Sequence, residues 1–438
     1  MRGWKMLPVL LVLLLTASTS FAGGFRLVEA GTKAMGMGFA FTAQADDPSA
    51  IYFNPAGLTQ LKGQNIMVGV TYVRENGADF TGTTPVDNNV PGPGFTNQKS
   101  ETQKSLNFYI PNAYYTKTTP DGYFSYGVGI FAPFGLGQEY NDKHSSIFRN
   151  QITKIDLMTV VVNPTIAFKI NEFLSVGVGI DYMYGKATLE KTPWSPALVP
   201  VAQNGNVFDL KLEGTGDAWG YNFGLLLKPT ENFRVGANYR SKFTLDIKDG
   251  DVNLGNINPG VAPALAGLTT TKGNATLYLP ATFALGVSYT MGKLTVNADA
   301  DWTFWSSYKS LPIDFKDNRP VLPDSNAAKN WKDVCALRFG GEYQVTVPLS
   351  LRAGFVYDPS PAPANTMGPE LPDAIKLDYM VGAGYKIGKW TIDVAGMYVD
   401  KKDRTVNNQA FTAAGGSGFN GTWTGDAWLV GLDVTYNF

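Results

Sequence analysis

The sequence predicts an all-β protein: a 14-stranded antiparallel transmembrane β-barrel with an N-terminal hatch, or plug, inside its lumen. Three features indicate this fold: a leader-like first segment, long stretches of alternating apolar and polar residues, and short connections that alternate with long ones along the chain. Gly 48, Tyr 21, Phe 26 and Trp 9 are frequent among the 438 residues, which favours strands over helices. A chain of this length exceeds one ordinary core, so it forms either several domains or one large closed structure.

Residues 1–22 are predicted to be a signal peptide. Arg2 and Lys5 give a positive start, Leu7–Leu15 is an apolar run too short to span a bilayer, and Ala22 is a small residue at the cleavage position. The mature chain is expected to begin at Gly23. Removing two of the 36 basic residues leaves 34 against 37 acidic ones, a net charge near −3. This balance lacks the basic surface of a nucleic-acid-binding protein, so no nucleic acid partner is expected.

The strand signal is clearest in three stretches, Phe233–Lys248, Lys293–Tyr308 and Trp428–Phe438, where apolar residues fall on one face and polar residues on the other. These stretches approach or exceed the roughly 9 to 11 residues that cross a membrane at a tilt. After the leader, no run reaches the roughly 18 apolar residues of a membrane helix, so a membrane-spanning chain must close into a barrel. Strands are predicted to begin near Ile66, Asn107, Tyr123, Lys154, Leu174, Val207, Phe233, Gly273, Lys293, Lys332, Leu349, Ala374, Trp390 and Thr422.

The connections alternate in length. Short links such as Thr119–Gly122, Asn171–Phe173, Thr230–Asn232 and Met291–Gly292 follow even-numbered strands. Short turns at one end and long loops at the other are typical of an outer-membrane barrel, with the turns in the periplasm and the loops outside. The predicted long loops are 76–105, 132–153, 191–206, 249–272, 309–331, 359–373 and 401–421. Aromatic residues near strand ends, predicted to form interfacial girdles, are Tyr109, Tyr114, Tyr115, Trp219, Tyr221, Trp302, Trp305, Trp390, Tyr398, Trp423, Trp428 and Phe438.

The segment 23–63 precedes the predicted barrel, which comprises residues 64–438. A barrel of fourteen strands is too wide for wall side chains to fill, so its lumen is either water-filled or plugged. The segment is Gly-rich and apolar and is broken by Pro48 and Pro55. A disordered tail would suit its glycines but not the apolar residues of Ile51–Phe53 and Leu58. We therefore predict a hatch inside the lumen, where inward-facing side chains satisfy its main-chain groups.

Several stretches together carry a family resemblance. The segment Gly24–Leu58, with its Asn54-Pro55-Ala56, is similar to the N-terminal hatch of the FadL family of outer-membrane transporters for long-chain fatty acids and other hydrophobic compounds. The resemblance implies that Phe25, Asn54, Pro55 and Ala56 belong to a hatch, and that ligand is captured at outer loops and leaves sideways at a kinked third strand. Further matches in the same order, covering essentially the whole mature chain, are Ala132–Asp142, Leu174–Lys191, Val235–Ser241, Asp301–Tyr308 and Leu371–Ile387.

The third predicted strand contains residues that weaken strand pairing. Pro133 has no N–H for the ladder, and Gly135 and Gly137 are typical of a bend or bulge. The resemblance places the family's kink at Gly135, so Pro133, Phe134 and Gly135 are the expected lateral gate. The alternative is that Pro133 only ends the strand at the outer rim.

Two predicted outer loops, Pro193–Ala202 and Asn258–Leu268, are apolar. A large exposed apolar patch is typical of a binding surface. The resemblance implies that they form a greasy capture groove; alternatively, they pack on each other as a lid. The resemblance also places Lys191 near a ligand headgroup. The expected ligand contacts in these loops are Trp194, Leu198, Val199, Val261 and Leu265. Other inward cations, Arg240, Arg338 and Arg352, are expected to pair with wall carboxylates such as Asp299, Asp301, Glu342 and Asp433.

Chemistry other than transport finds little support. Cys335 is the single cysteine, so no internal disulfide forms, and His144 is the single histidine, which excludes a His-based triad and a multi-His metal site. A Ser-Lys or an Asp-Glu site, as in a barrel lipase or protease, is the alternative, but no G-x-S-x-G motif is present. We predict no enzyme activity, metal or cofactor.

The prediction is a monomeric outer-membrane channel of a Gram-negative cell, surrounded by lipid and lipopolysaccharide, for a hydrophobic small molecule. A fatty acid and an aromatic hydrocarbon both remain open as ligands. The alternatives are a general porin, with an open lumen and an inward constriction loop, and a surface adhesin or phage receptor.

Overall fold

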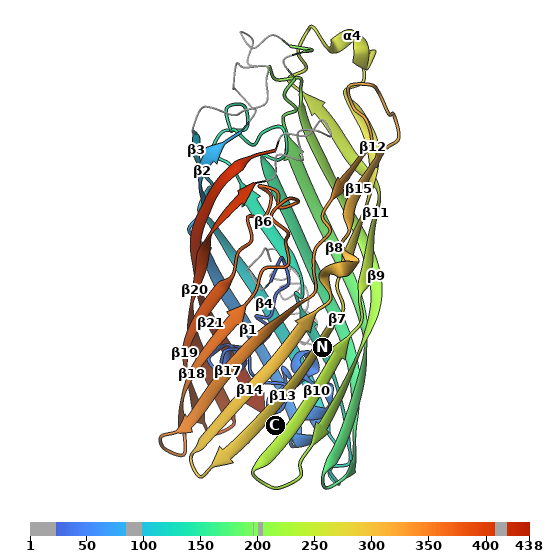
Figure 1. Ribbon diagram of the computed structural model, residues 1–438. Coiled ribbons are helices and arrows are strands. Elements are labelled where there is room, and N and C mark those ends of the chain that lie inside the picture. Colours follow the sequence, from blue (N-terminus) through green and yellow to red (C-terminus); the bar gives the residue numbers. More distant parts are fainter. Residues whose placement is uncertain (1–22, 85–98, 196, 200–204, 408–417) are drawn as a thin grey trace.

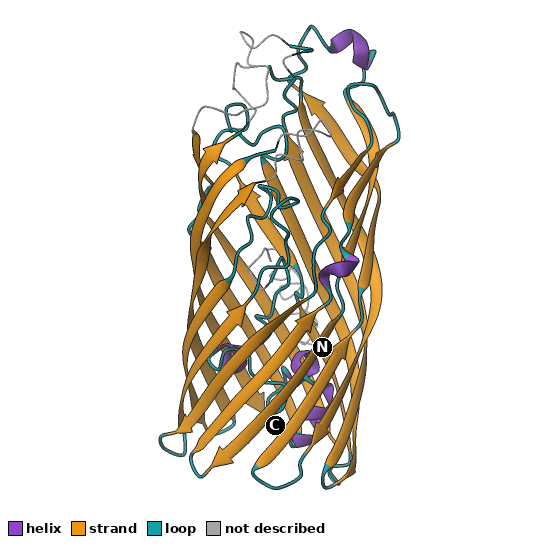
Figure 2. Cartoon of the chain, viewed as in Figure 1, coloured by secondary structure: helices purple, strands orange, loops and turns teal. Residues whose placement is uncertain are grey.

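The computed structural model describes residues 23–84, 99–195, 197–199, 205–407 and 418–438. The predicted signal peptide, 1–22, and parts of three predicted outer loops lie outside the described residues. The strands form one antiparallel sheet that closes on itself (Figures 1 and 2). Closure is made by β1 (Gln64–Glu75), which pairs with β21 (Asn420–Asn437) on one edge and with β4 (Leu106–Thr118) on the other. Each helix in the described part is too short or too polar to cross a membrane.

Fourteen strands cross the wall, as predicted, and their starts lie within three residues of the predicted ones. Four of them are interrupted and consist of two elements: β5 (Phe124–Phe131) with β6 (Gly135–Glu139), β10 (Phe233–Arg240) with β11 (Phe243–Gly255), β12 (Thr270–Leu279) with β13 (Thr282–Met291), and β14 (Leu294–Thr303) with β15 (Ser310–Phe315). The others are β1, β4, β7 (Lys154–Asn171), β8 (Leu174–Lys191), β9 (Asp209–Leu227), β17 (Val334–Gln344), β18 (Leu349–Asp358), β19 (Lys376–Ile387), β20 (Trp390–Asn407) and β21, with β2 (Asp79–Thr83), β3 (Lys99–Thr102) and β16 (Ser325–Ala328) extending the wall at its outer end.

The predicted loop 249–272 is partly wrong, because strand structure continues into it. β11 runs to Gly255 across a bulge, at which its register to β12 shifts between Ile247 and Gly250. Asp249 in this bulge has a left-handed φ of 51°. A bulge shifts the apolar alternation by one residue, which hides the continuing strand in the sequence. Parts of 309–331 are likewise strand, as β15 and β16.

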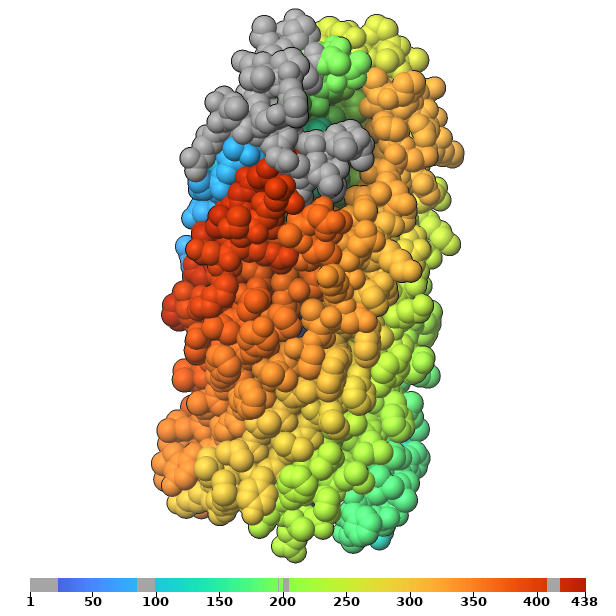
Figure 3. All heavy atoms as spheres, viewed as in Figure 1, coloured from blue at the N-terminus to red at the C-terminus, as the bar shows by residue number. Residues whose placement is uncertain are grey.

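The outer face carries the expected apolar belt between two aromatic girdles. Near the turns, the rings of Trp390 and Tyr436 lie 4.5 Å apart. Farther along the same two strands, Tyr398 and Trp428 form a second pair at 4.6 Å. Val430, 51% exposed, lies between these levels and points outward. The girdle prediction is confirmed at Trp390, Tyr398 and Trp428. It is wrong for Tyr114, Trp305 and Trp423, which are at most 3% exposed because they pack against other aromatic rings inside the barrel. The space-filling view shows a continuous wall on the face drawn (Figure 3).

Residues 23–61 lie inside the lower part of the barrel (Figures 1 and 2) and are almost entirely buried. They contain three short helices: α2 (Thr32–Met35), α3 (Ala50–Phe53) and the 3₁₀ helix η2 (Pro55–Gln60). Glycines on the inner face of the wall let this segment approach closely. A Cβ added at Gly177 would lie 2.5 Å from the carbonyl carbon of Pro55, and one at Gly340 would lie 2.1 Å from the carbonyl oxygen of Met37.

The connection after β18 also turns inward, which differs from the predicted outer loop 359–373. Met367 and Leu371 are buried. The carbonyl of Pro369 accepts hydrogen bonds from the Tyr140 hydroxyl at 2.8 Å and from the Gln103 amide at 3.2 Å. The apolar composition of this loop allows it to fill the lumen above the N-terminal segment, because burial removes its apolar side chains from water.

Candidate functional site

The third strand is interrupted at the three residues expected to form a gate. β5 ends at Phe131 and β6 begins at Gly135. Between them, the Pro133 carbonyl accepts a hydrogen bond from the Leu27 N–H at 2.8 Å, and the Gly135 N–H donates to the Phe25 carbonyl at 3.0 Å. The N-terminal segment therefore supplies a short strand partner to the interrupted part from inside the barrel.

The wall lacks strand pairing on the other edge of this interruption. β4 pairs with β1 over Leu106–Lys117, but its pairing with β5 covers only Ala113–Thr118. Contact with the third strand resumes where the Lys104 N–H donates to the Glu139 carbonyl at 2.8 Å. Among the described residues, no ladder joins Leu106–Asn112 to the third strand. Pro111, which has no N–H, lies within this unpaired stretch, and sequence reasoning missed that signal.

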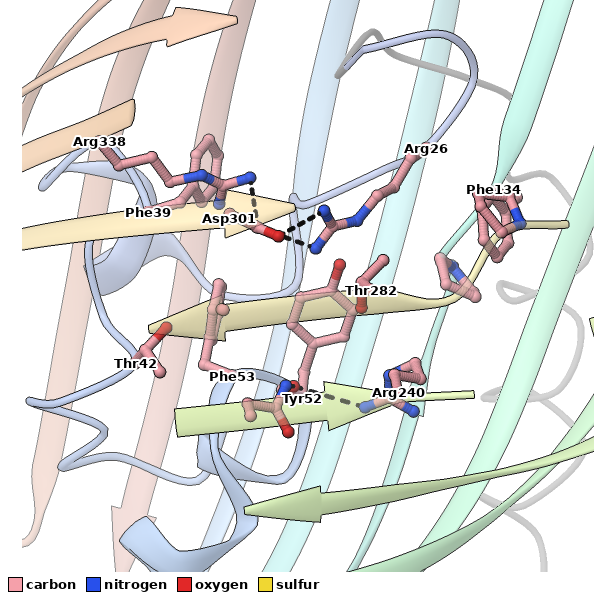
Figure 4. A pocket seen from close by; sticks show the side chains of 14 residues that line it. Arg26, Phe39, Thr42, Tyr52, Phe53, Phe134, Arg240, Thr282, Asp301 and Arg338 are labelled. Atoms are coloured by element: carbon pink, nitrogen blue, oxygen red, sulfur yellow. Dashed lines mark hydrogen bonds and ion pairs between the residues drawn. The ribbon is translucent and has the colours of Figure 1, made fainter. Parts of the chain in front are cut away.

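A small cavity lies beside the interruption (Figure 4). Its volume is about 20 Å³, measured as the space open to the centre of a water molecule. That is room for roughly one water, so a larger guest must displace side chains. The lining combines aromatic rings with three cations and includes Phe39, Tyr52, Phe53, Phe134, Arg26, Arg240, Arg338 and Asp301.

Two arginines of the cavity share one carboxylate. Arg26, from the N-terminal segment, binds Asp301 with both guanidinium nitrogens at 2.9 and 3.0 Å. Arg338 of β17 contacts the same carboxylate at 2.8 Å (Figure 4). All three side chains are buried, and the Nε of Arg338 has no hydrogen-bond partner. Arg26 and Arg338 therefore share one directly bonded carboxylate, and the buried carboxylates of Asp299 and Asp378 also interact with Arg338 electrostatically.

The remaining inward arginines are paired more completely. Arg352 binds Glu342 at 2.7 Å and Asp393 at 2.6 Å. Arg240 binds Asp181 at 2.5 Å, and its guanidinium lies 5.4 Å from the ring centre of Tyr52. The predicted pairing of inward cations with wall carboxylates is confirmed for Arg338 and Arg352. Arg240 takes a partner that the sequence did not single out.

Other wall carboxylates bind the main chain of the N-terminal segment, a role that the sequence did not reveal. Asp299 accepts hydrogen bonds from the Phe41 and Thr42 N–H groups, both at 2.9 Å. Asp433 accepts from the Thr32 N–H, and Asp358 from the Gly23 N–H. Hydrogen bonds to charged acceptors are stronger than neutral ones, so these contacts hold the segment at several heights in the lumen.

The Asn54-Pro55-Ala56 stretch fits closely against β9. The Asn54 amide donates to the Thr42 carbonyl at 2.8 Å and to the Leu225 carbonyl at 3.0 Å, and its side-chain oxygen accepts from the Ala56 N–H at 3.1 Å. Asparagine supplies both donor and acceptor here, so this one side chain starts η2 and ties it to the wall.

Phe25 joins an aromatic cluster above the cavity. Its ring centre lies 4.7 Å from Trp305 and 5.6 Å from both Tyr308 and Trp331, and it also approaches Phe134 at 6.3 Å. The cluster links the start of the N-terminal segment to the interrupted strand.

The two apolar outer loops share a second buried cluster. Val199, Val261 and Leu265 are at most 2% exposed, whereas Leu198 is 50% exposed. Trp194 is partly buried and packs against Gly205. Part of Pro193–Ala202 lies outside the described residues. In the described part, the loops pack on each other through these buried residues, while Leu198 and several small residues, among them Ala262 and Ala264, are exposed.

Lys191 ends β8 and pairs in register with Leu210. Its side chain is partly buried. Within the described part of the chain, no carboxylate forms an ion pair with it. Its possible role as a headgroup ligand stays a prediction.

Polar contacts fix the outer loops close to Lys191. Asp209, at the outer tip of β9, contacts Lys143 at 2.8 Å and His144 at 2.9 Å and accepts from Asn256 at 2.8 Å. Burial raises the pKa of Asp209, but these hydrogen bonds outweigh burial and hold its pKa at about 2.

The comparisons with known proteins agree with this architecture. A family model described as "Outer membrane protein transport protein (OMPP1/FadL/TodX)" matches residues 13–438. The long-chain fatty acid transport protein of Escherichia coli O6:H1 is 26% identical over 97% of this chain and 96% of its own length. The structure of a Pseudomonas aeruginosa FadL homologue has a TM-score of 0.79 at 21% identity, covering 95% of this chain and 100% of that one. The Ralstonia pickettii toluene transporter TbuX has a TM-score of 0.64 at 20% identity, covering 95% and 99%.

Proposed function

The chain belongs to the OMPP1/FadL/TodX family of outer membrane transport proteins, and on that premise we propose that it takes up amphipathic carboxylic acids of the long-chain fatty acid type and releases them sideways into the bilayer. The observation that carries the proposal is the unpaired stretch of wall between β4 and the third strand, directly beside a cavity with unequal numbers of arginines and carboxylates.

Residues 23–63 act as the hatch in this proposal. Their burial in the lumen and their hydrogen bonds to Asp299, Asp433 and Asp358 support a plug that blocks direct passage to the periplasm. A cavity of about 20 Å³ is too small for a fatty acid. Binding must therefore move side chains, and Arg26 is the mobile candidate because it belongs to the hatch and not to the wall.

Lateral release follows from the physical chemistry of the cargo. Each CH₂ kept out of water is worth roughly 0.8 kcal/mol, so a long acyl chain gains nothing by entering the periplasm. The inner side of the unpaired stretch is lined by the buried side chains of Phe108, Ile110 and Phe131. An apolar chain that passes Phe134 would therefore stay in apolar surroundings until it reaches lipid.

The cavity favours a carboxylate over a neutral hydrocarbon. Arg26 and Arg338 share Asp301, so a second carboxylate would complete two arginine–carboxylate pairs instead of one shared pair. A small aromatic hydrocarbon would form no such pair. Lys191 and the apolar residues of the outer loops, Trp194, Leu198, Val199, Val261 and Leu265, remain the proposed capture region.

The test is uptake of labelled oleate by Gram-negative cells that lack their own fatty acid transporter. Gly135→Arg, which places a bulky charge in the interruption, should reduce uptake severalfold at equal abundance in the outer membrane. Gly255→Arg is the control, since Gly255 ends β11 and an added Cβ meets only Asp209, at 3.8 Å. Equal uptake by wild type and Gly135→Arg would rule out lateral release at this strand. Liposome swelling by small sugars would instead support a general porin.

A further inference from the structure

We infer that Thr159 of β7 is the positioning residue that keeps the wall open at the third strand, because its hydroxyl replaces the strand partner that Phe134 lacks. The inference rests on the proposed lateral release and adds to it the device that holds the opening in shape.

The register of the third strand against β7 contains one extra residue. Phe131 pairs with Val161, and pairing resumes at Gly135 with Met158. Residues 132–134 of the third strand thus face only Thr159 and Val160 of β7. This is a β-bulge, which bends the strand that carries the extra residue and interrupts its ladder.

A single side chain satisfies both main-chain groups of the bulged residue. The Phe134 N–H donates to the Thr159 hydroxyl oxygen at 3.1 Å, and that hydroxyl donates to the Phe134 carbonyl at 2.6 Å. Both residues are buried, at 1% and 2% exposure. Buried main-chain groups need partners, and here the side chain of a β7 threonine provides them in place of the main chain of β7.

The flanking residues are held by the hatch and not by β4. The Leu27 N–H donates to the Pro133 carbonyl, and the Gly135 N–H donates to the Phe25 carbonyl. The bulge therefore has a permanent support on its β7 edge and a removable one on its inner side. When cargo displaces the hatch residues, the Thr159 contacts remain and prevent the third strand from straightening against Leu106–Asn112 of β4.

Without the Thr159 hydroxyl, the N–H and the carbonyl of Phe134 lose their hydrogen-bond partner. Thr159→Val keeps the shape and the β-branched side chain but has neither donor nor acceptor. Thr159→Ser restores both. The matched control is Thr165→Val on the same strand, where the buried hydroxyl donates to the Asn163 side chain at 3.2 Å and, among the described residues, forms no hydrogen bond to the third strand.

The experiment combines hydrogen exchange with uptake, using the full-length protein in detergent and in cells. Thr159→Val should raise exchange of the segment 132–136 about tenfold, the usual effect of losing one buried hydrogen bond. It should also lower oleate uptake severalfold at equal membrane abundance. Thr159→Ser should reverse both effects, and Thr165→Val should show neither.

The two readouts separate this inference from the proposed route. Unchanged exchange in Thr159→Val would overturn the role of Thr159 whatever the transport result. Faster exchange with unchanged uptake would also overturn it as a positioning residue, while a block by Gly135→Arg in the same cells would leave lateral release standing. If Gly135→Arg were also without effect, lateral release itself would fail.

Discussion

Substitution of Gly177 by alanine tests the seating of the hatch more directly than any change to the hatch itself. Gly177 lies on the inner face of β8, opposite Ala167 and Gly224 on the neighbouring strands. An added Cβ would lie 2.5 Å from the carbonyl carbon of Pro55 and 2.6 Å from the nitrogen of Ala56. Both are main-chain atoms, so a rotamer change cannot relieve the clash.

These contacts determine how much the alanine destabilises the seated hatch. Overpacking a well-filled interior typically costs about 1 to 3 kcal/mol. The clash is present only when the hatch is seated, so this cost should raise the population of the unseated state roughly 5- to 150-fold. The barrel itself should keep its fold, since the alanine methyl group projects into the lumen and not into the ladder.

Limited proteolysis measures that population. Trypsin cuts after Arg26 and Lys33, whose side chains are at most 14% exposed in the seated hatch. When opening and closing are fast, cleavage follows the population of the open state, so the initial rate of cleavage should rise by the same factor. Gly396→Ala is the control, because an added Cβ there meets no atom within 4 Å. Equal cleavage rates in both variants would refute the seating described above.

Other expected outcomes concern the ligand and the outer loops. A long-chain fatty acid should bind the wild-type protein at least tenfold more tightly than its methyl ester does, because a hydrogen bond to a charged group contributes about 1.5 to 3 kcal/mol. Arg338→Gln should remove this difference in affinity. If the wild-type protein bound the acid and the ester equally, the headgroup proposal would be contradicted. Mass spectrometry of hydrophobic compounds that co-purify with the barrel should find less carboxylic acid on Lys191→Ala; equal amounts would remove Lys191 from the capture region. The Asp209 carboxylate has a pKa below its ordinary 3.8, so its stabilising contribution is complete above that pH and is lost as the pH falls through about 2. Protection of residues 141–150 from hydrogen exchange, measured against the rate of an unfolded peptide at the same pH, should therefore stay high at pH 4 and fall near pH 2. Asp209→Asn should already lower this protection at pH 7; protection in Asp209→Asn equal to that in wild type would contradict this role.

Alternation of side chains, together with the leader and the loop lengths, predicted the barrel. It places Val430 on the outer face and Asp433 in the lumen, and both positions are observed. It is wrong for Phe243, Leu245 and Ile247, which are buried and not on the face of Tyr239, because the interruption after Arg240 shifts the alternation by one residue. Alternation gives the face of a residue but not its partner, however. Asp299 and Asp433 could equally have bound wall cations, and they bind N–H groups of the hatch because that segment passes them in three dimensions. Such contacts between positions far apart in the sequence leave no periodic signal.

The sequence predicted that the third strand is interrupted, but not what supports the interruption. Pro133 and Gly135 indicated weak pairing, which is a local property of these residues. The Thr159 contacts depend on a one-residue offset between two strands, and the sequence of β7 shows only a threonine on the inner face. The inward course of 359–373 was missed for a related reason: its proline and alanine content suits an exposed turn and a buried apolar loop equally.

That inward loop bears on the porin alternative, which required both an open lumen and a constriction loop. A loop does enter the lumen, but Met367 and Leu371 are buried within it, and the Pro369 carbonyl is bonded to Tyr140, beside β6. Below it, the hatch leaves a cavity of about 20 Å³. In the proposed function a polar solute would have to pass both segments, and a second, more open cavity of about 510 Å³, lined by residues 360–365 and Arg404, lies beside the inward loop. In the proposed route, an acyl chain instead displaces the two main-chain hydrogen bonds that join Phe25 and Leu27 to the third strand, and then enters lipid. The proposal therefore predicts that this pairing is the part of the hatch that the cargo moves.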